Sequence, residues 1–145
     1  ESKEIDENSI VSECAYVGSQ THIYNDTLRN NLTLWNEAIT DTHIKEVLER
    51  VNLLSFLSRI DEQVSDGSFS EGQKQRIGLI RAFLKGCSVV IFDEATANLD
   101  HKNAARIEHL LLSDPSITYI TVTHHLIKEN EPYFDEIIRL GEGTE

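Results

Sequence analysis

The stretch VVIFDE, residues 89–94, decides how the rest of the chain is interpreted. Four consecutive large apolar residues predict a strand that is buried on both faces, which is typical of a parallel strand in an α/β sheet. Asp93 and Glu94 then stand at the carboxyl edge of that strand, where open α/β sheets bind ligands. A carboxylate at this edge can hold Mg²⁺, and a second one can accept a proton from a water that attacks a phosphoryl group. An exposed acidic turn would explain the same residues, so the interpretation depends on what precedes the strand.

The residues before this strand predict a helix with a defined start. Ser70 followed three residues later by Gln73 has the form of a capping box. Three apolar residues then recur on one face of the helix: Ile77, Ile80 and Leu84. The amino terminus of such a helix carries free N–H groups and a partial positive charge, and Gly72 leaves its backbone open to a phosphate. Alone, these features describe only a well-capped helix.

Together, the segments FSEGQKQRIGLIRAFL (69–84) and VVIFDEATANLD (89–100) resemble the signature helix, the Walker B strand and the D-loop of the ABC-transporter ATPase family. Their order and spacing are also those of the family. The resemblance implies an α/β fold, with a partial P-loop NTPase (RecA-like) core around a parallel sheet and an α-helical subdomain of the ABC type. It assigns residues 1–20 and 85–145 to the core, and residues 21–84 to the helical subdomain that carries the signature motif.

Composition narrows the classes of function. The 145 residues have room for one domain, and 39% hydrophobic residues are enough for a core. A formal net charge of −12 argues against a nucleic-acid partner, because phosphate contacts need clustered Lys and Arg. Cys14 and Cys87 lack metal-ligand spacing, so we expect buried free thiols in a reducing cytosol. No apolar run approaches the roughly 20 residues that cross a bilayer, and no basic-then-apolar signal segment begins the chain.

A Walker A loop is missing from the sequence. P-loop ATPases cradle phosphates with Gly-x-x-x-x-Gly-Lys-Ser/Thr, and none of the seven glycines begins such a run. In the family this loop lies upstream of the Gln20 region. We therefore expect this chain to be the carboxyl-terminal portion of a longer nucleotide-binding domain, and to be inactive alone.

Gln20 follows a short apolar stretch, Cys14 to Val17, that predicts another strand. A surface glutamine after a strand is one explanation of this residue. However, the segment YVGSQTHIYNDTLRNNL (16–32) resembles the Q-loop of the family, in which the glutamine reaches the Mg²⁺ and the attacking water. The segment after it contacts the membrane partner, and its run TLRNNL (27–32) is most like exporter-type members.

Residues 36–66 predict helix rather than strand, with Asp41 as a cap. Apolar residues recur there at helical spacing, and we expect them in the core: Ile44, Val47, Leu48, Val51 and Leu54. The stretch shows no sustained heptads, whereas ABC-class ATPases of chromosome maintenance and DNA repair insert long coiled coils there. Residues 65–68, SDGS, predict a turn. By position they also resemble the segment through which exporters sense their transmembrane domains.

The last third of the chain adds a cap, a strand and a histidine. Asp100 is a natural cap for a helix, and as part of the D-loop the resemblance also places it against the opposite subunit near its nucleotide. Residues 117–122 predict a strand that leads to His124, beside the same crevice as Asp93 and Glu94. A histidine there can hydrogen-bond a terminal phosphate. The resemblance selects His124 as the H-loop residue and directs His125 elsewhere. We expect the other histidines to be structural or solvated: His22, His43, His101 and His109. A short strand over Glu136–Leu140 and a turn at 141–143 follow.

The resemblance implies hydrolysis of ATP with Mg²⁺. Asp93 and Gln20 hold the metal ion and its water, Glu94 is the general base, and His124 contacts the γ-phosphate. Three signature residues bind the γ-phosphate of an ATP that lies on another subunit: Ser70, Gly72 and Gln73. Two domains thus sandwich two nucleotides head to tail at the cytoplasmic face of the cell membrane. Their cycle drives the transmembrane domains of an exporter.

One departure from the family and two alternatives stay open. Glu71 occupies the place where the family most often has the first signature glycine, which predicts a weaker sandwich. The first alternative is a soluble ABC-class ATPase of DNA repair or translation; the acidic charge, the compact helical stretch and TLRNNL argue against it. The second is a non-catalytic module that supplies its signature helix in trans, against which the presence of Glu94 and His124 argues.

Overall fold

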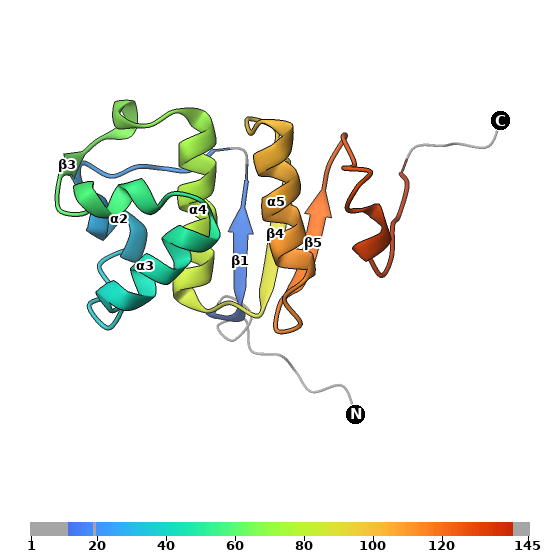
Figure 1. Ribbon diagram of the computed structural model, residues 1–145, viewed down its shortest axis with the longest axis horizontal. Coiled ribbons are helices and arrows are strands. Elements are labelled where there is room, and N and C mark those ends of the chain that lie inside the picture. The colour runs from blue at the N-terminus through green and yellow to red at the C-terminus, as the bar shows by residue number, and fades with distance from the viewer. Residues whose placement is uncertain (1–11, 19, 141–145) are drawn as a thin grey trace.

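The computed structural model describes residues 12–18 and 20–140 (Figure 1). The turn predicted at 141–143, and residues 1–11 of the predicted core, lie outside these residues. The strands are β1 (Cys14–Val17), β2 (Asp26–Thr27), β3 (Gln63–Val64), β4 (Val89–Asp93) and β5 (Thr118–Val122). The α-helices are α2 (Leu28–Thr33), α3 (Asp41–Arg50), α4 (Glu71–Lys85) and α5 (His101–Leu112). Short 3₁₀ segments are η1 (Leu54–Arg59), η2 (Asp66–Ser68) and η3 (Glu131–Tyr133).

A parallel sheet in the order β1-β4-β5 forms the centre of this part of the chain. The mixed α/β fold with a parallel sheet is therefore confirmed. In Figure 1, α5 lies in front of β4 and β5, and α4 runs alongside β1, with which it is in contact. Because α4 leads into β4 and α5 into β5, each helix runs back against the parallel strands. The amino termini of both helices therefore lie at the same edge as the carboxyl ends of the strands (Figure 1).

The two faces of the sheet differ. Val90 and Phe92 of β4 point to the helices and are buried. Tyr16 of β1 and Ile120 of β5, which share the opposite face in register with Ile91, are 66% and 48% exposed. The prediction that residues 89–92 are buried on both faces is wrong, because no second layer of helices covers that face among residues 12–18 and 20–140.

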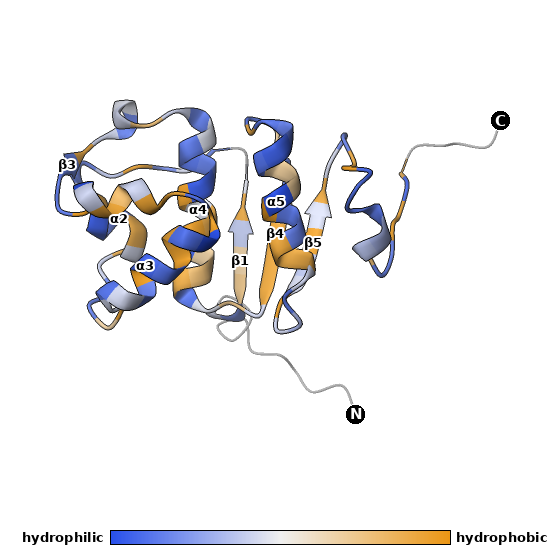
Figure 2. Ribbon diagram, viewed as in Figure 1, coloured by the Kyte–Doolittle hydropathy of each residue, from blue (hydrophilic) through white to orange (hydrophobic). Residues whose placement is uncertain are grey.

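The helix α4 has the predicted boundaries and the predicted apolar face. Ser70 is its N-cap, and the helix ends at Gly86, whose φ of 71° is a conformation that glycine adopts without strain. The predicted apolar face is buried: Ile77, Ile80 and Leu84. Figure 2 shows the hydrophilic amino-terminal end of α4 and hydrophobic residues along β4.

The prediction for residues 36–66 is correct in outline and wrong in three details. Helix α3 packs against α4 through a buried stripe that includes Ile44, Val47 and Leu48. Its N-cap is Thr40, whose hydroxyl accepts from the His43 N–H at 3.2 Å, so Asp41 is the first helical residue instead of the cap. Leu54 is 43% exposed, because it begins η1 where the α-helical spacing has already ended. Residues 63–64 form β3, which pairs with β2.

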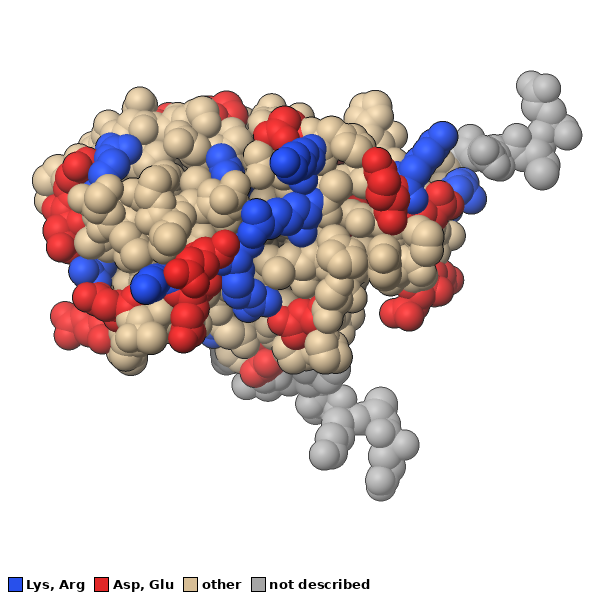
Figure 3. Space-filling view, viewed as in Figure 1, with Lys and Arg blue, Asp and Glu red and all other residues tan. Residues whose placement is uncertain are grey.

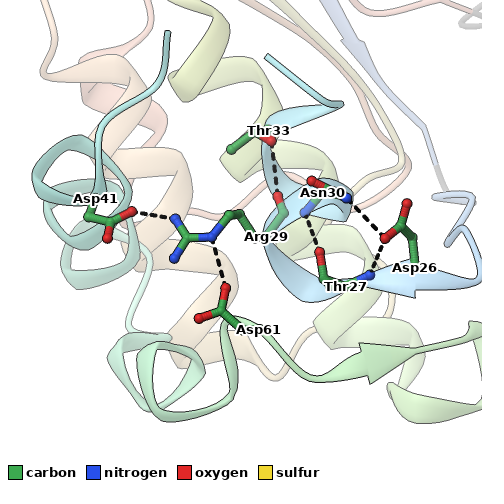
Figure 4. A network of polar contacts seen from close by, with 7 residues as sticks. All are labelled: Asp26, Thr27, Arg29, Asn30, Thr33, Asp41 and Asp61. Carbon is green, nitrogen blue, oxygen red and sulfur yellow. Dashed lines mark hydrogen bonds and ion pairs between the residues drawn. The ribbon is translucent and has the colours of Figure 1, made fainter. Parts of the chain in front are cut away.

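Arg29 of α2 joins three segments of this helical region (Figure 4). Its guanidinium contacts Asp41 at the start of α3 and Asp61 in the loop after η1. At the start of α2, Thr27 caps the helix by accepting from the Asn30 N–H at 3.1 Å. These contacts fix the segment that follows Gln20 against the segment that precedes α4.

The end of the described chain has no regular secondary structure. Residues 136–140 are irregular, so the predicted strand is wrong; no described strand pairs with them, and a strand needs a ladder partner. Cys87 is buried as predicted, whereas Cys14, the first residue of β1, is half-buried; both thiols are free.

On the face seen in Figure 3, basic and acidic side chains are interspersed. Of the helices described, none is long and apolar enough to span a bilayer.

Candidate functional site

Glu94 and His124 meet at the carboxyl edge of the sheet. Glu94 directly follows β4, and His124 lies two residues after β5, which pairs with β4 up to Asp93 and Val122. The His124 Nε2 atom is 2.9 Å from the Glu94 Oε1 atom. Both side chains line a hollow of about 370 Å³. The predicted convergence of these two residues is therefore present in the structure.

The backbone of Glu94 is held in an unusual conformation. Its φ of 52° lies in the left-handed region, which costs a non-glycine residue on the order of 1 kcal/mol. The Glu94 N–H donates to the Val122 carbonyl at 3.0 Å, which ties the residue to the end of β5. Such strain persists where the surrounding structure fixes it, and it is enriched at functional sites.

Asp93, one residue earlier, is engaged by a side chain that sequence reasoning missed. The Tyr16 hydroxyl donates to the Asp93 Oδ2 atom at 2.6 Å, and this bond raises the pKa of Tyr16. Alternation offered a signal: Tyr16 is in register with Ile91, and Ile91 and Asp93 share one face of β4. The side chain of Tyr16 thus lies on the same face as the Asp93 carboxylate.

Gln20 lies apart from Glu94 and His124. It is exposed and lines a second hollow, of about 510 Å³, between β1, α2 and α4. Tyr16, which donates to Asp93, lines the same hollow as Gln20. The structure therefore brings Asp93, Glu94 and His124 to one edge and leaves Gln20 beside it.

The signature residues lie at the amino terminus of α4, where Ser70 is exposed and Gly72 and Gln73 are half-buried. The capping box is complete: the Gln73 N–H donates to the Ser70 hydroxyl at 3.2 Å, and the Ser70 N–H donates to the Gln73 side-chain oxygen at 2.9 Å. Gly72 packs so closely on the loop after β4 that a Cβ atom there would lie 2.8 Å from the Asn98 carbonyl oxygen. The signature segment and the D-loop segment are thus in direct contact within this chain.

Asp100 caps α5, as predicted. Its carboxylate accepts from the Asn103 N–H at 3.0 Å, and this hydrogen bond is the main reason that the pKa of Asp100 is lowered. Arg76 of α4 adds a favourable charge at Asp100, while burial lowers the pKa of the Arg76 guanidinium. Arg76 was not singled out from the sequence, although it lies one turn after Gly72, to whose carbonyl it donates at 3.3 Å.

The carboxylates at this edge suit Mg²⁺ bound together with phosphate. Within the described part of the chain, no three His, Cys, Asp or Glu side chains gather as a cage for a metal ion. Mg²⁺ does not need one, because it keeps several waters and is usually held by one or two carboxylates and the substrate phosphates. Asp93, with Glu94 beside it, is a donor set of that kind.

The fold and the site define an α/β domain with its polar residues at the carboxyl edge of a parallel sheet, where such folds bind nucleotides. A family model described as "ABC transporter" matches residues 1–97. The chain belongs to the ABC transporter family.

Two relatives and one solved structure illustrate the likeness. The chain is 32% identical over 141 residues to a "Probable ABC transporter ATP-binding/permease protein" of Haemophilus influenzae, covering 93% of this chain and 25% of that protein. It is 30% identical over 115 residues to an "ATP-dependent lipid A-core flippase" of Desulfotalea psychrophila, covering 75% and 20%. This chain thus spans about a quarter or less of these relatives. A bacterial Atm1-family ABC exporter with ATP bound superposes with a TM-score of 0.73 at 22% identity, covering 81% of this chain and 22% of that one, which shows the shared fold.

Proposed function

We propose that this chain is part of the ATP-hydrolysing domain of an ABC exporter. The observation that carries the proposal is the contact between the Glu94 carboxylate and the His124 imidazole at the sheet edge, beside Asp93. An acceptor for a proton and a donor to a phosphate are both needed where a water attacks the terminal phosphate of ATP. The Glu94 carboxylate and the His124 imidazole stand side by side, 2.9 Å apart.

Each residue has one task at the reacting centre. Glu94 accepts the proton of the attacking water, and His124 donates to a γ-phosphate oxygen. Asp93 and Gln20 would hold Mg²⁺ and its water, and the ion would supply neutralisation of the phosphate charge. Gln20 lines the neighbouring hollow together with Tyr16, whose hydroxyl contacts Asp93. Catalysis of this kind rests on positioning and on charge neutralisation.

The amino terminus of α4 serves a second nucleotide. Three residues lie at the start of a 15-residue helix, whose N–H groups and partial positive charge suit a phosphate: Ser70, which is exposed, and Gly72 and Gln73, which are half-buried. We propose that they bind the γ-phosphate of ATP held by a second domain, head to tail, and that Asp100 faces the same partner. Residues 1–20 and 85–145 then act as the ATPase core, and residues 21–84 act as the helical subdomain.

The exporter assignment draws on the named relatives. One is called an ATP-binding/permease protein and another a lipid A-core flippase, so both names join ATP to transport. We propose that this chain works in the same setting, at the cytoplasmic face of a membrane with transmembrane domains as partners. The names do not favour a soluble ATPase of DNA repair or translation. They also do not favour a non-catalytic module.

The experiment is a comparison of two carboxylates in the full-length natural polypeptide. Phosphate release from Mg-ATP is measured for the parent, for Glu94→Gln, and for Glu62→Gln, a surface carboxylate paired with Arg59. We expect Glu94→Gln to lower turnover by a factor of about 100 or more while ATP still binds, since a general base contributes this order of rate. Glu62→Gln should match the parent. Equal turnover of Glu94→Gln and the parent would refute the proposal. Measurable turnover by residues 1–145 alone would contradict the separate expectation that this chain is inactive by itself.

A further inference from the structure

Glu71, at the first position of α4, does not stand free. Its carboxylate accepts a hydrogen bond from the Lys74 ammonium at 2.9 Å, three residues further along the helix. Lys74 also donates to Asp66 in η2, at 2.7 Å. The Lys74 side chain is only 10% exposed, whereas both carboxylates are largely exposed. A nearly buried cation therefore holds two surface carboxylates at the start of the signature helix.

The direction in which Glu71 points is important at this position. An uncompensated carboxylate in the first turn of a helix competes for the free N–H groups and repels any anion that approaches them. The Lys74 ammonium neutralises that charge and fixes the carboxylate toward the side where η2 lies. The same two bonds raise the pKa of Lys74, so it stays charged at neutral pH.

We propose that Lys74 is a positioning residue, which draws the Glu71 carboxylate aside and so keeps the Ser70 end of α4 open to the γ-phosphate of ATP. The inference rests on the proposed function and deepens it. It explains how this chain tolerates a glutamate next to Ser70. It also revises the expectation that Glu71 weakens the sandwich: the penalty appears only when Lys74 is removed.

The test is a double-mutant cycle in the full-length polypeptide. The parent carries Glu94→Gln so that ATP is not consumed, and ATP affinity is measured by equilibrium titration. We expect Lys74→Gln to weaken ATP binding about tenfold, as one uncompensated charge near a phosphate does in a partly screened site. Adding Glu71→Gly to Lys74→Gln should restore affinity to within about twofold of the parent, because the repelling group is then gone.

Two controls separate positioning from a structural role. Lys74→Arg keeps the charge and should bind ATP like the parent, and Arg59→Gln removes a surface cation paired with Glu62 and should also have no effect. Parental affinity of Lys74→Gln would overturn the inference, as would a double variant that stays as weak as Lys74→Gln. A parent that binds no ATP would instead refute the proposed function, and this inference with it.

Discussion

The helical region, residues 28–85, and the sheet region, formed by β1, β4, β5 and α5, bury their apolar side chains in different ways. In the helical region, α2 and α3 pack on α4 through side chains that are almost completely buried, such as Leu32, Ile44 and Ile80. In the sheet region, helices cover one face of the strands, and Tyr16 and Ile120 remain exposed on the other. The candidate catalytic residues belong to the sheet region. The signature residues belong to the helical region. The signature residues thus belong to a region with a fully buried core, whereas the candidate catalytic residues at the sheet edge belong to a region that is covered on one face.

The largest expected effect compares one isoleucine from each region. Ile44→Ala in α3 should destabilise the fold by about 2–5 kcal/mol, because it leaves a cavity among buried side chains. Ile120→Ala in β5 should cost less than about 1 kcal/mol in residues 1–145, because nearly half of that side chain is already in water. Urea unfolding followed by circular dichroism measures both.

The same pair of variants in the full-length polypeptide sharpens the comparison. If Ile120→Ala then costs as much as Ile44→Ala, a layer outside the described residues covers that face of the sheet. Similar small costs for Ile120→Ala in both chains would mean that the face is exposed to water in the whole protein. Equal costs for the two variants in residues 1–145 would contradict the distinction between the regions.

A smaller effect is expected where the two regions meet. Gly72→Ala places a methyl group 2.8 Å from the Asn98 carbonyl oxygen, a backbone atom that cannot turn aside. We expect a loss of about 1–3 kcal/mol in stability, the usual cost of overpacking. Gly67→Ala is the matched control: a methyl group there meets nothing within 4 Å, so stability should stay within about 0.5 kcal/mol of the parent. Differential scanning calorimetry of both variants compares them. A tolerated Gly72→Ala would mean that α4 and the loop after β4 can move apart.

The sequence predicted local structure well and contacts between segments poorly. Caps and periodicity are local signals, so the start of α4, the strand β4 and the Asp100 cap were correct. The burial of β4 on both faces was wrong, because a continuous apolar run along one strand does not show whether a second layer of helices exists. Tyr16 was missed as the partner of Asp93 since its hydrogen bond joins residues 77 positions apart. Lys74 was missed as well, because residue spacing alone does not show that its ammonium is nearly buried.

The smallest expected effect concerns Glu108, which lies where α5 packs on β5. Glu108 of α5 is buried and accepts from the Asn130 side chain at 3.0 Å and from the Tyr119 hydroxyl at 3.5 Å. A buried polar group therefore joins α5, β5 and the segment before η3, whereas the ion pairs of the helical region, such as Arg29 with Asp41 and Asp61, lie at its surface. Burial raises the pKa of Glu108 above its ordinary value of 4.5, and the hydrogen bond from Asn130 offsets part of the shift.

The sign of the pH dependence follows from this direction. The folded protein holds the Glu108 proton at pH values where the unfolded chain has already released it, so stability falls as the pH rises from about 4.5 through the raised pKa. Glu108→Gln keeps an acceptor for Asn130 and cannot ionise. The stability of the variant should therefore lack the part of the pH dependence that Glu108 causes. At neutral pH the variant should be slightly more stable than the parent. We expect this gain to be smaller than the stability difference between Gly72→Ala and Gly67→Ala. Urea unfolding at a series of pH values from 4 to 8 measures both slopes. If stability depends on pH in the same way for the variant and the parent, Glu108 ionises as easily in the folded protein as in water. Water would then reach Glu108 between α5 and β5.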